Sequence, residues 1–156
     1  MRKLTTRHFG EIEFDEKKII NFPQGLPGFP FDRNFLFMSE NDDEDTFFWL
    51  QSVDNGDVAF TLMNVYGVLP DYDPQVDEAE MNELGEITSA PLEIYNIAVI
   101  PEDITQMRVN LKAPIVMNME AGLGRQVICS NEDYPIRYYI FEGLSKLRQE
   151  AGKSEC

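Results

Sequence analysis

The segment between residues 47 and 63 restricts the fold more than any other part of the sequence. Two runs of mostly apolar residues, 47–52 and 58–63, flank the tetrapeptide Asp54-Asn55-Gly56-Asp57. An Asn-Gly pair supplies the positive φ angles of a tight turn, so these residues predict a β-hairpin. Because both runs are rich in large apolar side chains, we expect the two strands to lie in the centre of a sheet.

Similar short apolar segments follow one another along most of the chain, with Gly10 at a bend in the first and a Gly122-Leu123-Gly124 turn before the last. The pattern predicts a mainly β fold, in which a meander closes into a small single-domain barrel and leaves few exposed strand edges. Besides the hairpin, we expect strands or strand pairs at residues 5–14, 92–100, 108–111, 115–118 and 126–129.

Residues 23–30 contain three prolines and two glycines, a composition that excludes a regular helix or a central strand. Proline lacks a donor N–H and has a fixed φ, whereas glycine adopts turn conformations closed to other residues. We therefore expect an ordered loop with a specific shape, called the Pro/Gly loop below. Leu26 and Phe29 are its predicted anchors.

One short surface helix is predicted at about residues 74–84. Asp73 is a suitable N-cap, Pro74 suits the first helical position and Gly85 suits the end. The apolar positions form only a thin stripe, so acidic side chains are expected to face water; the stripe consists of Val76, Ala79, Met81 and Leu84. We assign residues 1–141 to the β domain and expect 142–156, rich in Lys and Glu, to be a flexible or weakly helical tail.

The net charge of −15 is concentrated in one part of the sequence. Between Arg33 and Arg108 there is no Lys, Arg or His, although this block holds 17 Asp and Glu residues. We therefore expect at least one strongly negative side, which disfavours direct nucleic-acid binding and attracts basic proteins. A solvated acidic face that serves only solubility is the alternative explanation.

The sequence also indicates a cytoplasmic protein that does not enter a membrane. No apolar run approaches the ~20 residues of a membrane-spanning helix, and the first eight residues lack the apolar stretch of a signal peptide. The only cysteines, Cys129 and Cys156, have no metal-binding or disulfide pattern.

The residue pattern provides no convincing catalytic group or cofactor site, so we predict a non-enzyme without cofactor or metal. His8 is the only histidine, and Cys129 lies in an apolar run that predicts a buried, inert thiol. The carboxylates lack the spacing of a calcium loop. Two alternatives stay open: a metal-assisted hydrolase that uses clustered carboxylates, and a general acidic decoy for nucleic-acid-binding proteins.

Five sequence blocks, taken together, resemble the FliW family of flagellar assembly factors. The similarity extends from about Phe9 to Arg137, although Val65 stands where the family often has proline. The blocks lie at residues 22–29, 50–52, 71–72 and 110–116, and at 126–128 with Asn131 and Tyr134.

This resemblance implies a cytoplasmic factor, monomeric when free, with two protein partners. One is newly made flagellin, for which the factor acts as a chaperone. The other is the translational repressor CsrA, a small RNA-binding dimer whose repression of flagellin messenger RNA the factor antagonises without competing for the RNA site. The predicted CsrA contacts are Asp71, Asp73, Asp77 and Glu78. The predicted flagellin contacts are Leu26, Phe29, Val68, Leu69 and Tyr72, each of which is alternatively an ordinary core residue.

Overall fold

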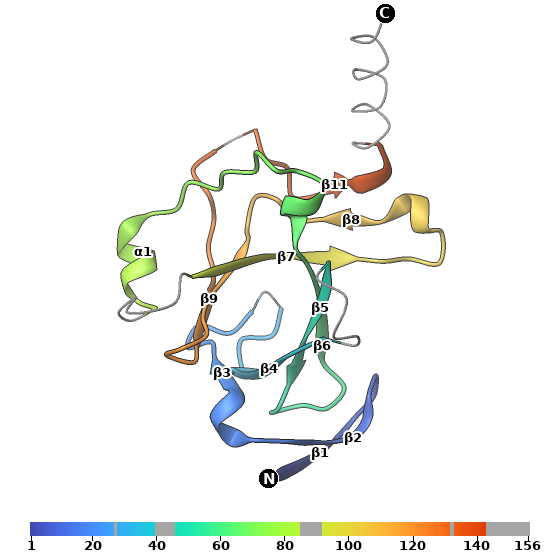
Figure 1. The fold of residues 1–156 in the computed structure, drawn as a ribbon, viewed down its shortest axis with the longest axis vertical. Helices are drawn as coiled ribbons and strands as arrows, with labels where there is room; N and C mark the ends of the chain where they lie inside the picture. The colour runs from blue at the N-terminus through green and yellow to red at the C-terminus, as the bar shows by residue number, and fades with distance from the viewer. Residues whose placement is uncertain (27, 40–45, 85–91, 132, 143–156) are drawn as a thin grey trace, which may run out of the picture.

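The computed structural model describes residues 1–26, 28–39, 46–84, 92–131 and 133–142. The predicted helix end at Gly85 and the predicted tail, apart from Glu142, lie outside these residues. Within them the chain forms a closed barrel, a separate hairpin at its N-terminal end and a short helix on its outer surface (Figure 1).

Seven strands form the barrel, and their order confirms the predicted mainly β meander. Successive strands from β3 to β7 pair antiparallel, β9 pairs with both β7 and β10, and a parallel contact between Leu123 and Asn21 closes the ring. The strands are β3 (Ile19–Asn21), β4 (Asn34–Met38), β5 (Phe47–Ser52), β6 (Ala59–Met63), β7 (Glu93–Val99), β9 (Ile115–Asn118) and β10 (Leu123–Gln126).

Large apolar side chains from all around the ring fill the barrel interior, which we call the inner core. The rings of Phe22 and Phe35 meet edge to face with 5.3 Å between their centroids. Each such side chain stabilises the fold by about 1.5–3 kcal/mol when it is fully buried. The inner core consists of Ile20, Phe22, Leu26, Phe35, Leu50, Leu62, Tyr95, Ile115 and Met117.

The predicted hairpin is present as β5 and β6, but its turn is not the predicted one. Six residues, 53–58, connect the strands, and neither Asn55 nor Gly56 has a positive φ. Gly56 is needed for a different reason, because a Cβ there would lie 2.1 Å from the carbonyl oxygen of Thr5. A contact with the N-terminal end of the chain, and not the turn geometry, therefore requires glycine.

The N-terminal hairpin consists of β1 (Arg2–Thr6) and β2 (Gly10–Phe14). The predicted strand pair is therefore present, but it begins at Arg2 instead of Thr5, and Gly10 opens the second strand. Gly10 has a φ of 67°, and the Thr6 hydroxyl donates to its carbonyl at 2.8 Å. The hairpin is a sheet of its own. The backbone N–H of Arg7 donates to the Gly56 carbonyl at 3.0 Å and joins the hairpin to the β5–β6 loop.

The β7 strand divides one of its edges between two partners. Residues 93–95 pair with β9, whereas residues 98–99 pair with β8 (Arg108–Val109). The β8 strand therefore leaves the ring and pairs on its other side with β11 (Tyr138–Tyr139). This division creates an apolar layer outside the barrel, the outer core, which contains Met63, Val65, Tyr72, Ala98, Met107, Val109, Leu111 and Ile140.

The strand predicted at 126–129 begins earlier than expected, since β10 covers Leu123–Gln126. Gly122 has a φ of 67° and belongs to the turn, whereas Gly124 lies inside the strand. A Cβ on Gly124 would lie 2.5 Å from the Phe22 ring, so this position admits no side chain. Cys129 lies beyond the strand and is buried, as predicted, with 3% of its surface exposed.

The predicted helix is shorter than expected, because α1 covers only Glu78–Asn82. Its N-cap is Asp77 instead of Asp73, and the Asp77 carboxylate accepts a hydrogen bond from the Ala79 N–H at 2.8 Å. Residues 73–76 do not join the helix because their backbone binds another segment: Ser130 donates its N–H to the Gln75 carbonyl at 2.7 Å. The helix does lie on the surface of the barrel (Figure 1).

Three of the four predicted apolar helix positions do pack on the barrel. Val76, Met81 and Leu84 contact a cluster that includes Val116 of β9, whereas Ala79 is exposed. The sequence pattern therefore identified most of the contact surface of this segment but overestimated its helical length.

The Asp54 carboxylate connects the β5–β6 loop to the start of β4. It accepts hydrogen bonds from the backbone N–H groups of Arg33, at 2.9 Å, and Asn34, at 3.0 Å. Burial by itself raises the pKa of Asp54, but these hydrogen bonds outweigh it and hold the pKa below its ordinary value. The folded protein therefore favours the charged carboxylate.

We predict that Gly56→Ala destabilises the protein because the new methyl group meets the Thr5 carbonyl. Overpacking of this kind costs about 1–3 kcal/mol. Gly67→Ala is the matched control, since a Cβ at Gly67 has no atom within 4 Å, and should change stability by less than about 0.5 kcal/mol. Urea unfolding of both variants tests this; equal stabilities would exclude the Thr5 contact as the reason for glycine.

We predict that Asp54→Asn destabilises the protein by about 1 kcal/mol near neutral pH, because charge-assisted hydrogen bonds are lost from an exposed group. The folded pKa of Asp54 lies below the ordinary value of 3.8. The contribution of the charged carboxylate to the free energy of unfolding is therefore complete above the ordinary pKa. This contribution is lost as the pH falls through the lower pKa of the folded state. Urea unfolding from pH 7 to pH 2.5 should show the two proteins converging in stability, and a constant difference would contradict this.

Candidate functional site

A mainly apolar hollow of about 360 Å³ opens on the outer surface of the barrel, between Tyr134 and the segment that follows the 3-10 helix η2 (Val65–Gly67). Val68 and Leu69 are half-buried on the edge of the outer core. Three of the predicted flagellin contacts therefore meet here. The hollow is lined by Val68, Leu69, Pro70, Asp71, Tyr72 and Tyr134.

Tyr72 is buried beneath this hollow, where the hydrogen bonds of its hydroxyl hold it in place. The hydroxyl donates to the Leu111 carbonyl at 2.6 Å and accepts from the Asn96 side-chain amide at 3.1 Å. The same amide nitrogen donates to the Asn110 carbonyl at 2.8 Å. Burial strongly raises the pKa of Tyr72, so its hydroxyl remains a protonated donor at neutral pH.

Two more tyrosines contact Tyr72. Its ring centroid lies 5.7 Å from that of Tyr66 and 4.8 Å from that of Tyr134. The Tyr134 hydroxyl accepts a hydrogen bond from the backbone N–H of Asp73 at 2.8 Å. Burial, followed by the negative charge of Asp73, raises the pKa of Tyr66 above its ordinary value.

The acidic segment, residues 71–83, continues from the edge of the hollow to the end of α1. It carries six carboxylates: Asp71, Asp73, Asp77, Glu78, Glu80 and Glu83. All four predicted CsrA contacts lie in this segment and are exposed. The Asp77 carboxylate is also the helix cap.

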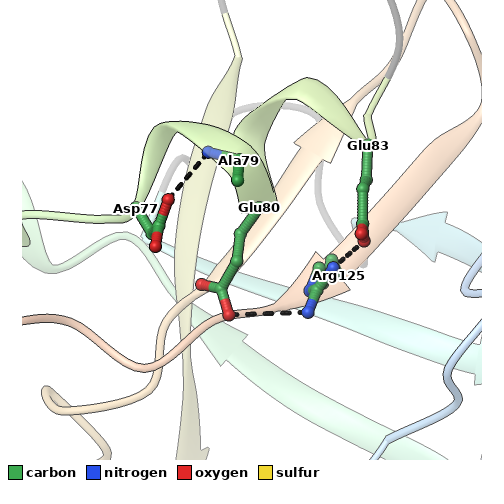
Figure 2. A network of polar contacts seen from close by, with 5 residues as sticks. All are labelled: Asp77, Ala79, Glu80, Glu83 and Arg125. Atoms are coloured by element: carbon green, nitrogen blue, oxygen red, sulfur yellow. Dashed lines mark hydrogen bonds and ion pairs between the residues drawn. The ribbon is translucent and has the colours of Figure 1, made fainter.

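Arg125 of β10 fastens the helical end of the acidic segment to the barrel (Figure 2). The Arg125 side chain is only 17% exposed, and its guanidinium forms ion pairs with Glu80, at 3.5 Å, and with Glu83. The Asn118 side chain donates to the Leu84 carbonyl at 2.8 Å just beyond. The acidic segment is therefore held at several points, and Arg125 partly neutralises its last two carboxylates.

The other described acids of the block 34–107 belong to other elements of the fold. Asp54 and Asp57 are in the β5–β6 loop, Glu93 begins β7, and Glu102 and Asp103 follow β7. The negative block of the sequence is therefore divided in space, and the acidic segment is its largest described part.

The two predicted contacts in the Pro/Gly loop do not join the hollow. Leu26 is 4% exposed and belongs to the inner core, so its side chain is not available at the surface. Phe29 is 38% exposed and packs against Phe60 with 5.5 Å between the ring centroids. The start of the loop instead borders the end of α1 across a cavity of about 30 Å³ beside Arg125.

Sequence reasoning missed three residues of the site. Tyr134 was identified only as part of a family block, and no local pattern relates Tyr66 to it. No feature of the sequence singles out Arg125. Tyr134 and Arg125 meet the site through contacts between distant parts of the chain, such as the bond between Asp73 and Tyr134, which are 61 residues apart. Tyr66 contacts Tyr72, only six residues away.

Neither a metal cluster nor a histidine dyad is found in the described part of the chain. No group of three or more His, Cys, Asp or Glu side chains there has a metal-binding arrangement. His8 is exposed and stacks on Trp49 with 6.3 Å between the ring centroids. Among the same residues, no helix is long and apolar enough to span a lipid bilayer.

Comparison with known proteins gives a consistent result over nearly the whole chain. The profile of the FliW protein family matches residues 3–140. A flagellar assembly factor FliW from Caldicellulosiruptor bescii is 43% identical over 93% of this chain and 94% of its own length. Another, from Alkaliphilus metalliredigens, is 36% identical over 97% and 93%. A crystal structure of the flagellar assembly factor FliW superimposes with a TM-score of 0.81 at 31% identity, covering 90% of this chain and 97% of that chain.

We predict that Tyr72→Phe destabilises the protein by about 1–3 kcal/mol, because the buried Leu111 carbonyl loses its donor. Tyr66→Phe removes the same atom from a ring that is 37% exposed and should cost less than about 0.5 kcal/mol. Thermal and urea unfolding of both variants measure the difference. Similar stabilities would mean that the Tyr72 hydroxyl does not hold the hollow in place.

Proposed function

Because this chain belongs to the FliW family of flagellar assembly factors, we propose that it binds two protein partners and catalyses no reaction. The first partner is flagellin, which it accompanies in the cytoplasm as a chaperone before secretion. The second is the translational repressor CsrA, whose repression of flagellin messenger RNA it antagonises. Accumulated flagellin then displaces CsrA from the factor and restores repression.

The apolar hollow supports the flagellin part of the proposal. The terminal segments of flagellin are amphipathic helices that stay unpaired until the filament assembles. An amphipathic helix binds by placing its apolar face in an apolar groove. The half-buried side chains of Val68 and Leu69 beside Tyr134 have this character.

The acidic segment supports the CsrA part. A repressor that holds RNA presents basic surface, and an oppositely charged segment accelerates the encounter with it. Once bound, the same carboxylates repel RNA phosphates at separations within the Debye length, about 10 Å at 0.1 M salt. The family resemblance favours a position beside the RNA site, and repulsion of this range would oppose RNA binding from there.

The meeting of these two surfaces is the observation that carries the proposal. Asp71 lines the apolar hollow and Asp73 bonds to Tyr134, another lining residue, while both belong to the acidic segment. A flagellin helix in the hollow and a CsrA dimer on the acidic segment would therefore meet at these two aspartates. This overlap gives competition between the partners a direct physical basis.

Capture of the tagged protein from a flagellated bacterium tests the proposal as a whole. Flagellin and CsrA should both be recovered, each in separate complexes, and added flagellin should release CsrA. Recovery of neither partner from cells that express both would refute the proposed function.

We predict that replacing Asp71, Asp73 and Asp77 with Asn, and Glu78 with Gln, slows CsrA association at least tenfold at 50 mM salt, with little effect at 500 mM. Asn at position 77 preserves the helix cap. The matched control removes four other exposed carboxylates, at Glu11, Glu13, Asp57 and Glu102. Surface plasmon resonance measures both; equal effects of the two variants would indicate attraction by net charge alone.

A further inference from the structure

Aromatic and acidic residues lie together at the edge of the apolar hollow, and the binding of an apolar helix face requires neither the acidic residues nor their position beside the aromatic ones. Tyr66 and Tyr134 are partly exposed, and the rings of both contact the buried Tyr72. Asp71 lines the hollow together with Tyr134, and Asp73, whose backbone N–H donates to the Tyr134 hydroxyl at 2.8 Å, is exposed next to it. Aromatic faces next to carboxylates form a binding site for an organic cation, because the ring quadrupole and the negative charge attract it together.

We propose that this edge binds an arginine side chain of the flagellin segment that occupies the hollow, with the guanidinium against Tyr66 and Tyr134 and paired with Asp71 or Asp73. This inference rests on the proposed function, since it takes the hollow as the flagellin-docking surface. Apolar residues of the segment fill the hollow, and the arginine fixes its direction and register.

The chain's own ion pairs indicate which carboxylates are left for a partner. Arg125 engages Glu80 and Glu83 at the far end of the acidic segment. Asp71 and Asp73 form no ion pair with any described residue, and residues 34–107 contain no Lys, Arg or His to supply one. The charge at the edge of the hollow is therefore complementary to a cation from outside the chain.

Arginine fits this edge better than lysine does. Its planar guanidinium stacks on aromatic rings and forms two parallel hydrogen bonds with one carboxylate, whereas the lysine ammonium is a compact and strongly hydrated charge. The hydrogen bonds of Tyr72 and the bond between the Asp73 backbone and the Tyr134 hydroxyl hold Tyr72, Tyr134 and the backbone at Asp73 in place before a partner arrives. Such preorganisation reduces the entropy lost on binding.

The test measures flagellin binding by calorimetry at 50 and 300 mM NaCl for three variants. Asp71→Asn with Asp73→Asn should weaken binding about tenfold at low salt and less at high salt. Asp57→Asn with Glu102→Gln, the control with the same change in charge, should bind as the parent does. Val68→Ser should weaken binding at both salt concentrations, because it changes the apolar lining of the hollow. Thermal unfolding of each variant confirms that it is folded.

A second measurement observes the cation site directly. The peptide acetyl-Leu-Arg-Leu-amide should shift the ring NMR signals of Tyr66 and Tyr134, whereas the same peptide with citrulline, which is isosteric and uncharged, should not. Equal shifts with the two peptides would overturn the inference. Normal flagellin binding by the variant with Asp71→Asn and Asp73→Asn would also overturn it. If Val68→Ser still weakened binding in that case, the hollow would remain the flagellin-docking surface without a cation site. Normal binding by Val68→Ser would instead refute the hollow as the flagellin surface.

Discussion

The division of the β7 edge is the constraint on which the rest of the structure depends. Residues 93–95 pair with β9 and close the barrel, while residues 98–99 pair with β8 and direct it outwards. Where the two partners separate, the backbone carbonyls of Asn110 and Leu111 need other donors, which the buried Asn96 amide and Tyr72 hydroxyl supply. An unsatisfied buried carbonyl costs about 1–3 kcal/mol, so this network determines where the segment that carries Tyr72 must lie.

The docking surfaces follow from the position of that segment. With Tyr72 anchored in the outer core, the preceding residues form one wall of the apolar hollow and the following residues run along the barrel towards α1. Tyr134 lies opposite and bonds to Asp73, and Arg125 holds the helical end. An apolar surface and a negative surface are thus joined through a few residues of one segment. The proposed exchange between an amphipathic partner and a basic one depends on this arrangement.

The distribution of charge shows how far composition determines a surface. The block without basic residues is continuous in the sequence, but the barrel separates Asp54 and Asp57 from the acidic segment. The carboxylates also differ in their roles. Asp54 holds backbone N–H groups, Asp77 caps a helix, Glu80 and Glu83 bind Arg125, and Asp71 and Asp73 stay available at the edge of the hollow.

The sequence by itself determined the mainly β fold, most of its strands, the hairpin and the family, because apolar runs, turn residues and motif blocks report on neighbours a few positions apart. It did not predict β3 and β4 as strands, and it placed β10 three residues too late. Only the tertiary structure decided what several of those residues do. Gly56 is required by Thr5 and not by its turn, Asp77 and not Asp73 caps the helix, and Leu26 is buried in the inner core. The hollow itself depends on Tyr134 meeting Asp73 across 61 residues, a contact that no local pattern contains because barrel closure creates it.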